Sequence, residues 1–328
     1  MPTVQVTTYP YGVSSRDPID MLDQAGFEVR LSPHGRKHTS QETAALLGDV
    51  DILIAGTEAL TAEVLQQGLP RLKLVSKNGV GLDGVDLDFC RDHGIAVMYT
   101  PDAPARSVVE QVFGVLISLS RRFVEAHEAL RQGEWRRLTG VLWDGKTLGI
   151  IGCGRIGKQV SVIANAFRMK VLAYDIEEDL DWAAAHDVTY VDKETLLRES
   201  DAVTLHVPLT ADTNKMIDAN ELAQMKQGSF LLNTCRGPVV DEAALIDALK
   251  SGHLGGAAID VYEHEPYQGA LSEIPNVFLT AHQGSCSHTG RYQMETGSAG
   301  NAIDFWLGRP MDPQRTVFIP DDYHPPGA

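Results

Sequence analysis

This sequence lacks the features that mark membrane and secreted proteins. Its longest uncharged apolar stretch, residues 112–119, is far too short to cross a bilayer. The N-terminus enters a strand-like pattern at once, without a basic segment followed by an apolar signal core. These absences predict a soluble, cytoplasmic protein that has no membrane partner.

Positive charge and cysteine are also scarce. The chain has 28 Lys and Arg against 44 Asp and Glu among its 328 residues, a formal net charge of −16. Such a chain repels phosphates, so we expect no nucleic acid partner. Cys90, Cys153, Cys235 and Cys286 lie far apart and form no C-x-x-C pair, which favours reduced thiols. Cys286 and His288 have no third ligand nearby, so no metal site is predicted.

The first hundred residues alternate short apolar strands with helical segments. This alternation predicts a parallel sheet covered by helices. The turn after the first strand, Tyr9-Pro10-Tyr11-Gly12, is not a glycine-rich phosphate turn, so this half serves something other than a dinucleotide. The expected strands lie near 4–8, 27–32, 51–55, 72–76 and 96–99.

Pro101 and Pro104 then interrupt the chain. Apolar residues at helical spacing predict one long helix over residues 107–131. Residues 132–144, with Trp135 and Trp143, resemble an extended arm; local packing and a dimer contact are equally compatible with these tryptophans. A last helix is expected over 298–307, followed by an extended tail from 308 to 328. Further strands are predicted near 147–151, 170–174, 188–191, 202–206, 229–233, 257–260 and 277–280.

A glycine-rich turn at the end of the strand 147–151 is the strongest motif. Gly152, Gly154 and Gly157 form G-x-G-x-x-G between a strand and a helix. These glycines permit a tight turn, backbone approach to a pyrophosphate and close helix packing. Asp175 lies 18 residues beyond Gly157, where a carboxylate accepts hydrogen bonds from ribose hydroxyls and repels a 2′-phosphate. The motif therefore predicts NAD(H) rather than NADP(H).

Three polar residues follow predicted strands in the second half of the chain. Arg236, Glu265 and His282 all belong to the end of the sheet at which open α/β sheets bind ligands. A histidine can donate a proton to the alkoxide formed by hydride transfer, and a carboxylate can orient the ring. A guanidinium can hold a substrate carboxylate. Taken singly, each residue could equally be a surface or packing residue.

Together the motifs resemble the D-isomer-specific 2-hydroxyacid dehydrogenases over nearly the whole chain. The matching segments are 145–152 (GKTLGIIG), 206–210 (HVPLT), 233–242 (NTCRGPVVDE) and 255–266 (GGAAIDVYEHEP). The resemblance implies two doubly wound parallel-sheet α/β domains with a cleft between them. A flavodoxin-like substrate domain would comprise 1–100 and 286–328, and a Rossmann NAD-binding domain 101–285. It also implies a homodimer formed through the NAD-binding domains.

The resemblance assigns roles by position. His282 would be the acid/base, Glu265 its partner and Arg236 the substrate anchor. The loop Asn78, Gly79, Val80 and Gly81 would receive the substrate carboxylate. The residues expected to contact NAD are Gly152, Gly154, Arg155, Ile156, Gly157, Asp175, His206, Val207, Pro208, Thr213, Thr234, Cys235, Asp260 and His282.

We therefore expect an NAD(H)-dependent oxidoreductase that interconverts a 2-keto acid and its (R)-2-hydroxy acid. Glyoxylate, hydroxypyruvate, pyruvate and bulkier keto acids all fit. The alternatives are a phosphoglycerate dehydrogenase and a non-catalytic NAD-sensing regulator. Glu58 argues against the first, because it would repel a phosphate in a loop that lacks the expected Arg and Ser. The sequence departs from the family at Ala281, where proline usually precedes the catalytic histidine.

Overall fold

The computed structural model describes residues 1–325, and the chain divides into two compact units. Unit 1 combines Met1–Ala105 with the segment from Ser285 onward, and unit 2 is Arg106–Gly284. The boundaries expected from the sequence, after residues 100 and 285, lie within five residues of these. Within residues 1–325, no helix combines the length and apolar character needed to cross a bilayer.

Unit 1 contains a six-stranded sheet with the strand order β13-β5-β4-β3-β1-β2. The first five strands in the chain are parallel in the order 2-1-3-4-5, as in flavodoxin-like folds, and β13 is antiparallel to β5. The strands are β1 (Thr3–Val6), β2 (Glu28–Arg30), β3 (Ile52–Ala55), β4 (Leu74–Lys77), β5 (Ala96–Met98) and β13 (Thr316–Phe318).

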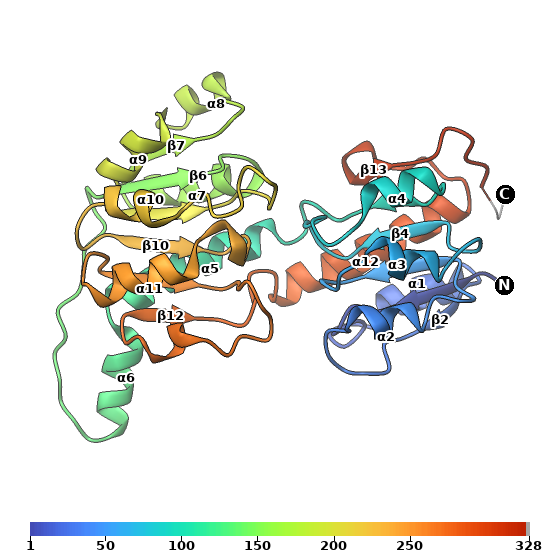
Figure 1. The fold of residues 1–328 in the computed structure, drawn as a ribbon, viewed down its shortest axis with the longest axis horizontal. Helices are drawn as coiled ribbons and strands as arrows, with labels where there is room; N and C mark the ends of the chain where they lie inside the picture. Colours follow the sequence, from blue (N-terminus) through green and yellow to red (C-terminus); the bar gives the residue numbers. More distant parts are fainter. Residues whose placement is uncertain (326–328) are drawn as a thin grey trace. The chain divides into compact units, whose positions relative to one another are not determined.

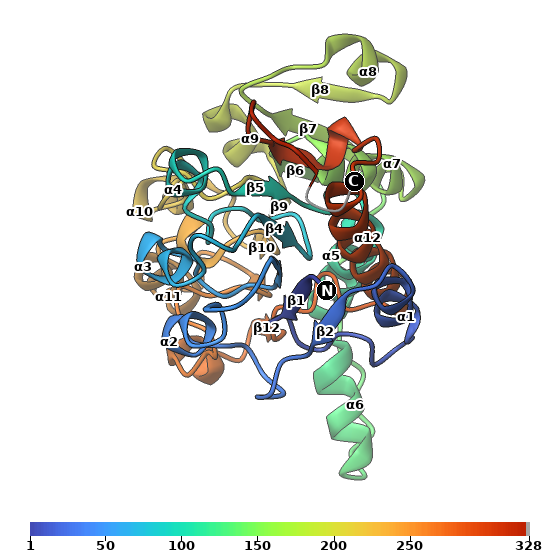
Figure 2. The same ribbon diagram turned by 90° about the vertical axis from the view of Figure 1, so that its right-hand side faces the viewer.

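Helices cover both faces of this sheet. One face packs against α1 (Asp17–Gln24) and α12 (His288–Trp306), which lie side by side (Figure 2). The other face packs against α2 (Ser40–Ala44), α3 (Ala62–Gln66) and α4 (Leu87–Asp92). Alternate residues of a strand face opposite sides, so the central strands are apolar on both.

Unit 2 contains seven parallel strands in the order β12-β11-β10-β9-β6-β7-β8 (Figure 1). The chain starts at β6, winds outward to β8 and then continues from β9 on the other side. This is the Rossmann order, and its switch point lies between β6 and β9. The strands are β6 (Thr147–Ile151), β7 (Lys170–Tyr174), β8 (Val188–Tyr190), β9 (Ala202–Leu205), β10 (Phe230–Asn233), β11 (Gly256–Ile259) and β12 (Val277–Leu279).

The helices of unit 2 form a layer on each side of its sheet. One face packs against α5 (Ala105–Ser120) and α7 (Arg155–Ala166). The opposite face packs against α9 (Lys193–Glu199), α10 (Ala219–Gln224) and α11 (Glu242–Lys250). Two doubly wound α/β units are thus present, which confirms the predicted fold class.

The prediction of one long helix over residues 107–131 was wrong. The structure has α5 and then α6 (Phe123–Arg131), separated by Arg122 in a left-handed conformation with φ of 54°. Apolar residues continue through the break, so the pattern concealed it. Residues 132–144 form no helix or strand, as expected. Trp143 is buried against Phe230, whereas Trp135 is 80% exposed.

Residues 285–325 contain more helix and strand than the sequence indicates. Helix α12 begins at His288, ten residues before the predicted start, and Ser287 caps it by accepting the N–H of Gly290. Two glycines and few apolar residues hide this first part of the helix. Within the predicted extended tail, Thr316–Phe318 forms strand β13. Residues 326–328 of the predicted tail lie outside the described residues. The short helix α8 (Leu180–Ala185) was not predicted.

In both sheets, an aspartate side chain accepts a backbone N–H at the start of the first strand. Asp51, 8% exposed, accepts the N–H of Thr3 at 2.7 Å and pairs with the Nε and Nη2 atoms of Arg71. In unit 2, Asp201 accepts the N–H of Thr147 at 2.8 Å. Each carboxylate precedes a neighbouring strand, so it joins two parallel strands at their N-terminal ends.

We expect Asp51→Ala to destabilise unit 1, because it leaves a strand N–H and Arg71 without their shared acceptor. The loss should be about 1.5–3 kcal/mol in the free energy of unfolding, typical of a hydrogen bond to a charged group. Urea denaturation measures it. Asp49→Ala is the control, because Asp49 pairs with Arg30 on the surface and should matter little. Equal midpoints for the two variants would contradict the role of Asp51.

Candidate active site

The glycine turn joins β6 to α7 at the carboxyl edge of the unit 2 sheet. Gly152 has φ of 93°, and a Cβ there would lie 2.6 Å from the carbonyl oxygen of His206. A Cβ on Gly157 would lie 2.2 Å from the carbonyl oxygen of Gly152. Gly154 differs, because a Cβ there would meet nothing within 4 Å. Packing therefore explains two glycines, while Gly154 retains the open backbone that a pyrophosphate needs.

Asp175 lies beside this turn at the end of β7. Its Oδ2 accepts the N–H of Cys153 at 2.6 Å, and its Oδ1 accepts the N–H of Glu177 at 3.1 Å. Two N–H donors leave lone pairs on a carboxylate for further hydrogen bonds. Exposed Glu177 and Glu178 follow, so a 2′-phosphate here would meet several negative charges.

On the other side of the switch point, β9 leads into His206, Val207 and Pro208. His206 Nε2 lies 3.0 Å from the hydroxyl of Thr204. Burial lowers the pKa of His206 to about 3, so its imidazole is neutral at physiological pH. The hydroxyl of Thr213 donates to the carbonyl of Pro208 at 2.6 Å and closes the following turn.

The loop after β10 carries Thr234, Cys235 and Arg236. Asn233 holds it, because its Nδ2 donates to the carbonyl of Arg236 at 2.8 Å and its Oδ1 accepts the N–H of Cys235 at 3.1 Å. Burial raises the pKa of the Cys235 thiol to about 11, so the thiol is uncharged. The Thr234 hydroxyl is buried and has no hydrogen-bond partner among residues 1–325.

Asp260 follows β11 and is 2% exposed. Its Oδ1 accepts the N–H of Gln283 at 2.8 Å and the hydroxyl of Thr280, and its Oδ2 accepts the N–H of Gly284 at 2.9 Å. The carboxylate therefore organises the turn that follows β12. The sequence predicts Asp260 only as a contact of NAD and does not indicate this structural role.

His282 and Glu265 form a close pair. His282 Nδ1 lies 3.0 Å from both carboxylate oxygens of Glu265. His282 has φ of 53°, and its N–H donates to the carbonyl of Asp260 at 2.8 Å. The side chains remain 33% and 18% exposed, respectively, so the ring is accessible. The structure thus brings together two residues that are 17 positions apart in the sequence.

Arg236 lies on the loop adjacent to this pair. A Cβ on Gly237 would lie 2.0 Å from the carbonyl carbon of Tyr262, so the Arg236 loop packs directly on the segment that leads to Glu265. Strands β10, β11 and β12 are neighbours in the sheet. Their carboxyl ends present a guanidinium, a carboxylate and an imidazole at one edge.

Unit 1 has its own loop at the carboxyl end of β4, formed by Asn78, Gly79, Val80 and Gly81. Gly79 has φ of 139°, and its N–H donates to the hydroxyl of Thr100 at 2.8 Å. Asn78 is 7% exposed, and Val80 is 38% exposed.

These features fit a dinucleotide cofactor. Gly154 leaves its backbone accessible, and the N-terminus of α7 supplies N–H groups and partial positive charge for phosphates. Asp175 retains acceptor capacity at the position that suits a ribose, and Thr234 has an unused hydroxyl. The fold and this edge together define an NAD-binding oxidoreductase.

Comparisons with known proteins identify the family. The model of the D-isomer specific 2-hydroxyacid dehydrogenase NAD-binding domain matches residues 113–284. A glyoxylate reductase of Thermococcus litoralis is 39% identical over 79% of this chain and 82% of its own length. A hydroxypyruvate reductase of Thermotoga maritima is 37% identical over 84% of this chain and 92% of its own length. The Aquifex aeolicus D-lactate dehydrogenase complexed with NAD and lactic acid has a TM-score of 0.85 and 27% identity, covering 97% of this chain and 100% of that one.

The chain belongs to the D-isomer specific 2-hydroxyacid dehydrogenase family. It is an NAD-dependent oxidoreductase that interconverts a 2-keto acid and its 2-hydroxy acid. The family, reaction class and cofactor expected from the sequence are confirmed. The individual residue roles stay predictions.

We expect Asp175→Ala to reduce the preference for NADH over NADPH, because it removes both the ribose acceptor and the charge that repels a 2′-phosphate. The ratio of kcat/KM values for the two cofactors should fall on the order of tenfold or more. Glu199→Ala, at an exposed carboxylate at the end of α9, is the control. A ratio that Asp175→Ala leaves at the wild-type value would contradict the ribose assignment.

Proposed function

We propose that the enzyme reduces small 2-keto acids without a phosphate group, glyoxylate and hydroxypyruvate among them, with His282, Glu265 and Arg236 in the active roles. The relatives from Thermococcus litoralis and Thermotoga maritima are named after these two substrates. The observation that carries the proposal is the contact of His282 Nδ1 with both oxygens of Glu265 at 3.0 Å. With Nδ1 so engaged, Nε2 is the nitrogen that exchanges a proton with the substrate.

In the reductive direction, His282 begins as an imidazolium that donates its Nδ1–H to Glu265. When bound, the dinucleotide supplies the hydride that reduces the substrate carbonyl carbon. As the carbonyl oxygen gains negative charge, His282 transfers its Nε2 proton to that oxygen and becomes neutral. Glu265 stays ionised and fixes the tautomer and orientation of the ring. Such general acid catalysis contributes roughly 10²–10⁴-fold.

Arg236 is the proposed anchor for the substrate carboxylate. Its planar guanidinium can donate two parallel hydrogen bonds to a carboxylate, which fixes the orientation of the keto group. Asn233 supports this role, because it holds the loop at the carbonyl of Arg236. For unit 1 we propose a substrate-binding function that uses the backbone of residues 78–81.

The proposed cofactor contacts follow the carboxyl edge of unit 2. The pyrophosphate would lie on Gly152 and Gly154 and on the first turn of α7, with the adenosine ribose at Asp175. The neutral side chains of His206 and Cys235 add no charge beside it. The remaining proposed contacts are Arg155, Ile156, Gly157, Val207, Pro208, Thr213, Thr234 and Asp260, with His282 at the nicotinamide end.

A phosphorylated substrate is the second candidate, and the end of β3 argues against it. Glu58 is 2% exposed, and its carboxylate accepts the N–H of Gly56 and the hydroxyl of Thr7. These donors therefore already hold an anion. A phosphate bound at this loop would meet a fixed negative charge.

We further propose a homodimer formed through unit 2. Helix α6 and the segment that follows it stand away from the sheet (Figure 1). Together with α7 they expose several large apolar side chains, which is typical of an interaction surface. These are Phe123, Val124, Leu130, Trp135, Leu142, Val162, Ile163 and Phe167.

A cytoplasmic location is proposed from the thiols. All four cysteines are unpaired, including the exposed Cys286. Burial raises the pKa of Cys90 to about 12, so that thiol is unreactive. Free thiols persist in reducing compartments, of which the cytoplasm is the common one.

We expect His282→Ala to lower kcat by roughly 10²–10⁴-fold with glyoxylate and hydroxypyruvate, because the proton donor is lost. NADH affinity, measured by fluorescence titration, should stay within about threefold, since the ring contacts the cofactor at one end only. His288→Ala, an exposed histidine, serves as the control.

The same assays should include the 3-phosphorylated form of hydroxypyruvate. Faster turnover of this compound than of the unphosphorylated acids would overturn the proposed substrate class. Loss of NADH binding in His282→Ala at unchanged kcat would remove His282 from its role.

The dimer is tested by Trp135→Glu, which introduces a charge into the proposed apolar contact. The variant should have the solution mass of one 35.7 kDa chain, whereas the unmodified protein should have twice that mass. Light scattering coupled to size exclusion measures both. Val13→Glu, at an exposed apolar residue of unit 1, should remain dimeric. A dimeric Trp135→Glu variant would exclude this surface.

A further inference from the structure

Tyr262 contacts both sides of the proposed proton-transfer pair. Its N–H donates to Glu265 Oε1 at 3.3 Å. Its hydroxyl lies 2.9 Å from the carbonyl of Thr280, two residues before His282, and 3.1 Å from the carbonyl of Ile259. We propose that Tyr262 is a positioning residue that holds the Glu265 carboxylate and the His282 turn in register for proton transfer. This inference rests on the proposed roles of His282 and Glu265.

His282 lies in the segment that follows strand β12. Strand β12 has three residues and lies at the edge of the sheet, where it pairs with β11 alone among residues 1–325. Beyond the last residue of β12, the N–H of Thr280 donates to the carbonyl of Ile259 at 3.1 Å, and the N–H of His282 donates to the carbonyl of Asp260 at 2.8 Å. The hydroxyl of Tyr262 reaches the carbonyls of Thr280 and Ile259. It therefore adds a side-chain link between the two segments, beside the backbone bonds of Thr280 and His282.

The position of Glu265 relative to the ring is equally constrained. His282 Nδ1 is equidistant from the two carboxylate oxygens, so a small rotation of either group would favour one oxygen and redirect Nε2. The N–H of Tyr262 bonds one of these oxygens directly. One residue thus restrains the carboxylate through its backbone and the histidine strand through its side chain.

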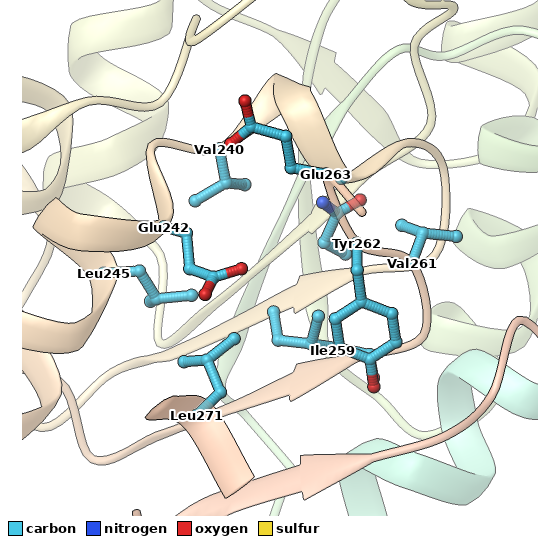
Figure 3. Close-up of a pocket in the computed structure, with 10 residues that line it drawn as sticks. Val240, Glu242, Leu245, Ile259, Val261, Tyr262, Glu263 and Leu271 are labelled. Carbon is cyan, nitrogen blue, oxygen red and sulfur yellow. The ribbon is translucent and has the colours of Figure 1, made fainter. Parts of the chain in front are cut away.

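Tyr262 is itself well fixed. It is 9% exposed, and its ring stacks on Tyr267 with centroids 4.2 Å apart. Gly237 packs against its backbone. Figure 3 shows Tyr262 beside a cavity that Ile259 and Leu271 also line. The cavity measures about 10 Å³, room for roughly one water molecule, so the ring has little freedom to move away.

The phenol also stays a donor over the working range of pH. Burial raises the pKa of Tyr262 to about 12, and the nearby Asp260, Tyr267 and Glu265 act in the same direction. The hydroxyl is therefore protonated at neutral pH. Its hydrogen can be shared between the carbonyls of Ile259 and Thr280.

The test compares Tyr262→Phe with the matched control Tyr267→Phe. Both variants lose one hydroxyl from the same ring stack, but the hydroxyl of Tyr267 donates to Glu242 at 2.7 Å, away from the pair. Steady-state rates with NADH and glyoxylate or hydroxypyruvate are measured across pH. They are normalised to the number of NADH-binding sites, so that a partly unfolded preparation cannot imitate the effect.

We expect Tyr262→Phe to lower kcat on the order of fivefold, with KM and NADH affinity changed less than about twofold. The acid limb of kcat/KM against pH should shift by roughly half a pH unit, because the contact between Glu265 and His282 is loosened. Tyr267→Phe should show neither change. Tyr262→Phe that matches the control in kcat and pH profile overturns the inference.

A double-mutant cycle with Glu265→Gln separates positioning from general stability. The effect of Tyr262→Phe on kcat should largely vanish in the Glu265→Gln background, because the hydroxyl is expected to act on kcat through the contact between His282 and Glu265. Additive losses would place Tyr262 outside the pair. An unmodified enzyme that is inactive on all keto acids tested would refute the proposed substrates. An active enzyme that is indifferent to Tyr262→Phe would refute this inference alone.

Discussion

The turn that carries His282 depends on the hydrogen bonds accepted by the buried carboxylate of Asp260. This aspartate accepts two backbone N–H groups and one hydroxyl from the segment 280–284, while its own carbonyl accepts the N–H of His282. A charge this deep would be costly without donors. The donors belong to the turn itself, so the same hydrogen bonds stabilise the buried carboxylate and fix the shape of the turn. The left-handed backbone of His282 is kept in place by this closure.

The positions of the other proposed site residues depend on the parallel order of the strands. Because all seven strands of unit 2 point the same way, their carboxyl ends meet at one edge. The glycine turn and Asp175 follow β6 and β7, whereas Arg236, Asp260 and His282 follow β10, β11 and β12. The residues proposed to bind phosphate and those proposed to transfer the proton therefore lie at different positions along the same edge of the sheet. Unit 1 uses the same principle, with Glu58 and the Asn78 loop after β3 and β4.

Much of this could be predicted from local patterns, and the failures have physical causes. Apolar runs identified the parallel strands, and the glycine spacing identified the cofactor turn. The break at Arg122 escaped because apolar residues run through it, and the start of α12 because glycines weaken its periodicity. Strand β13 depends on pairing with β5, more than 200 positions away, which no local pattern encodes. The structural roles of Asn233 and Asp260, and the contact of Tyr262 with Glu265, likewise exist only in three dimensions.

The discontinuity of unit 1 has a consequence for how the protein is made. Helix α12 supplies Ala299, Ala302, Ile303 and Phe305 to the core that covers one face of the N-terminal sheet. The ribosome synthesises these residues only after the whole of unit 2. One apolar face of the N-terminal sheet therefore stays uncovered while unit 2 is synthesised. Nascent chains paused within unit 2 would expose that face, and chaperones that recognise apolar surface would find it there.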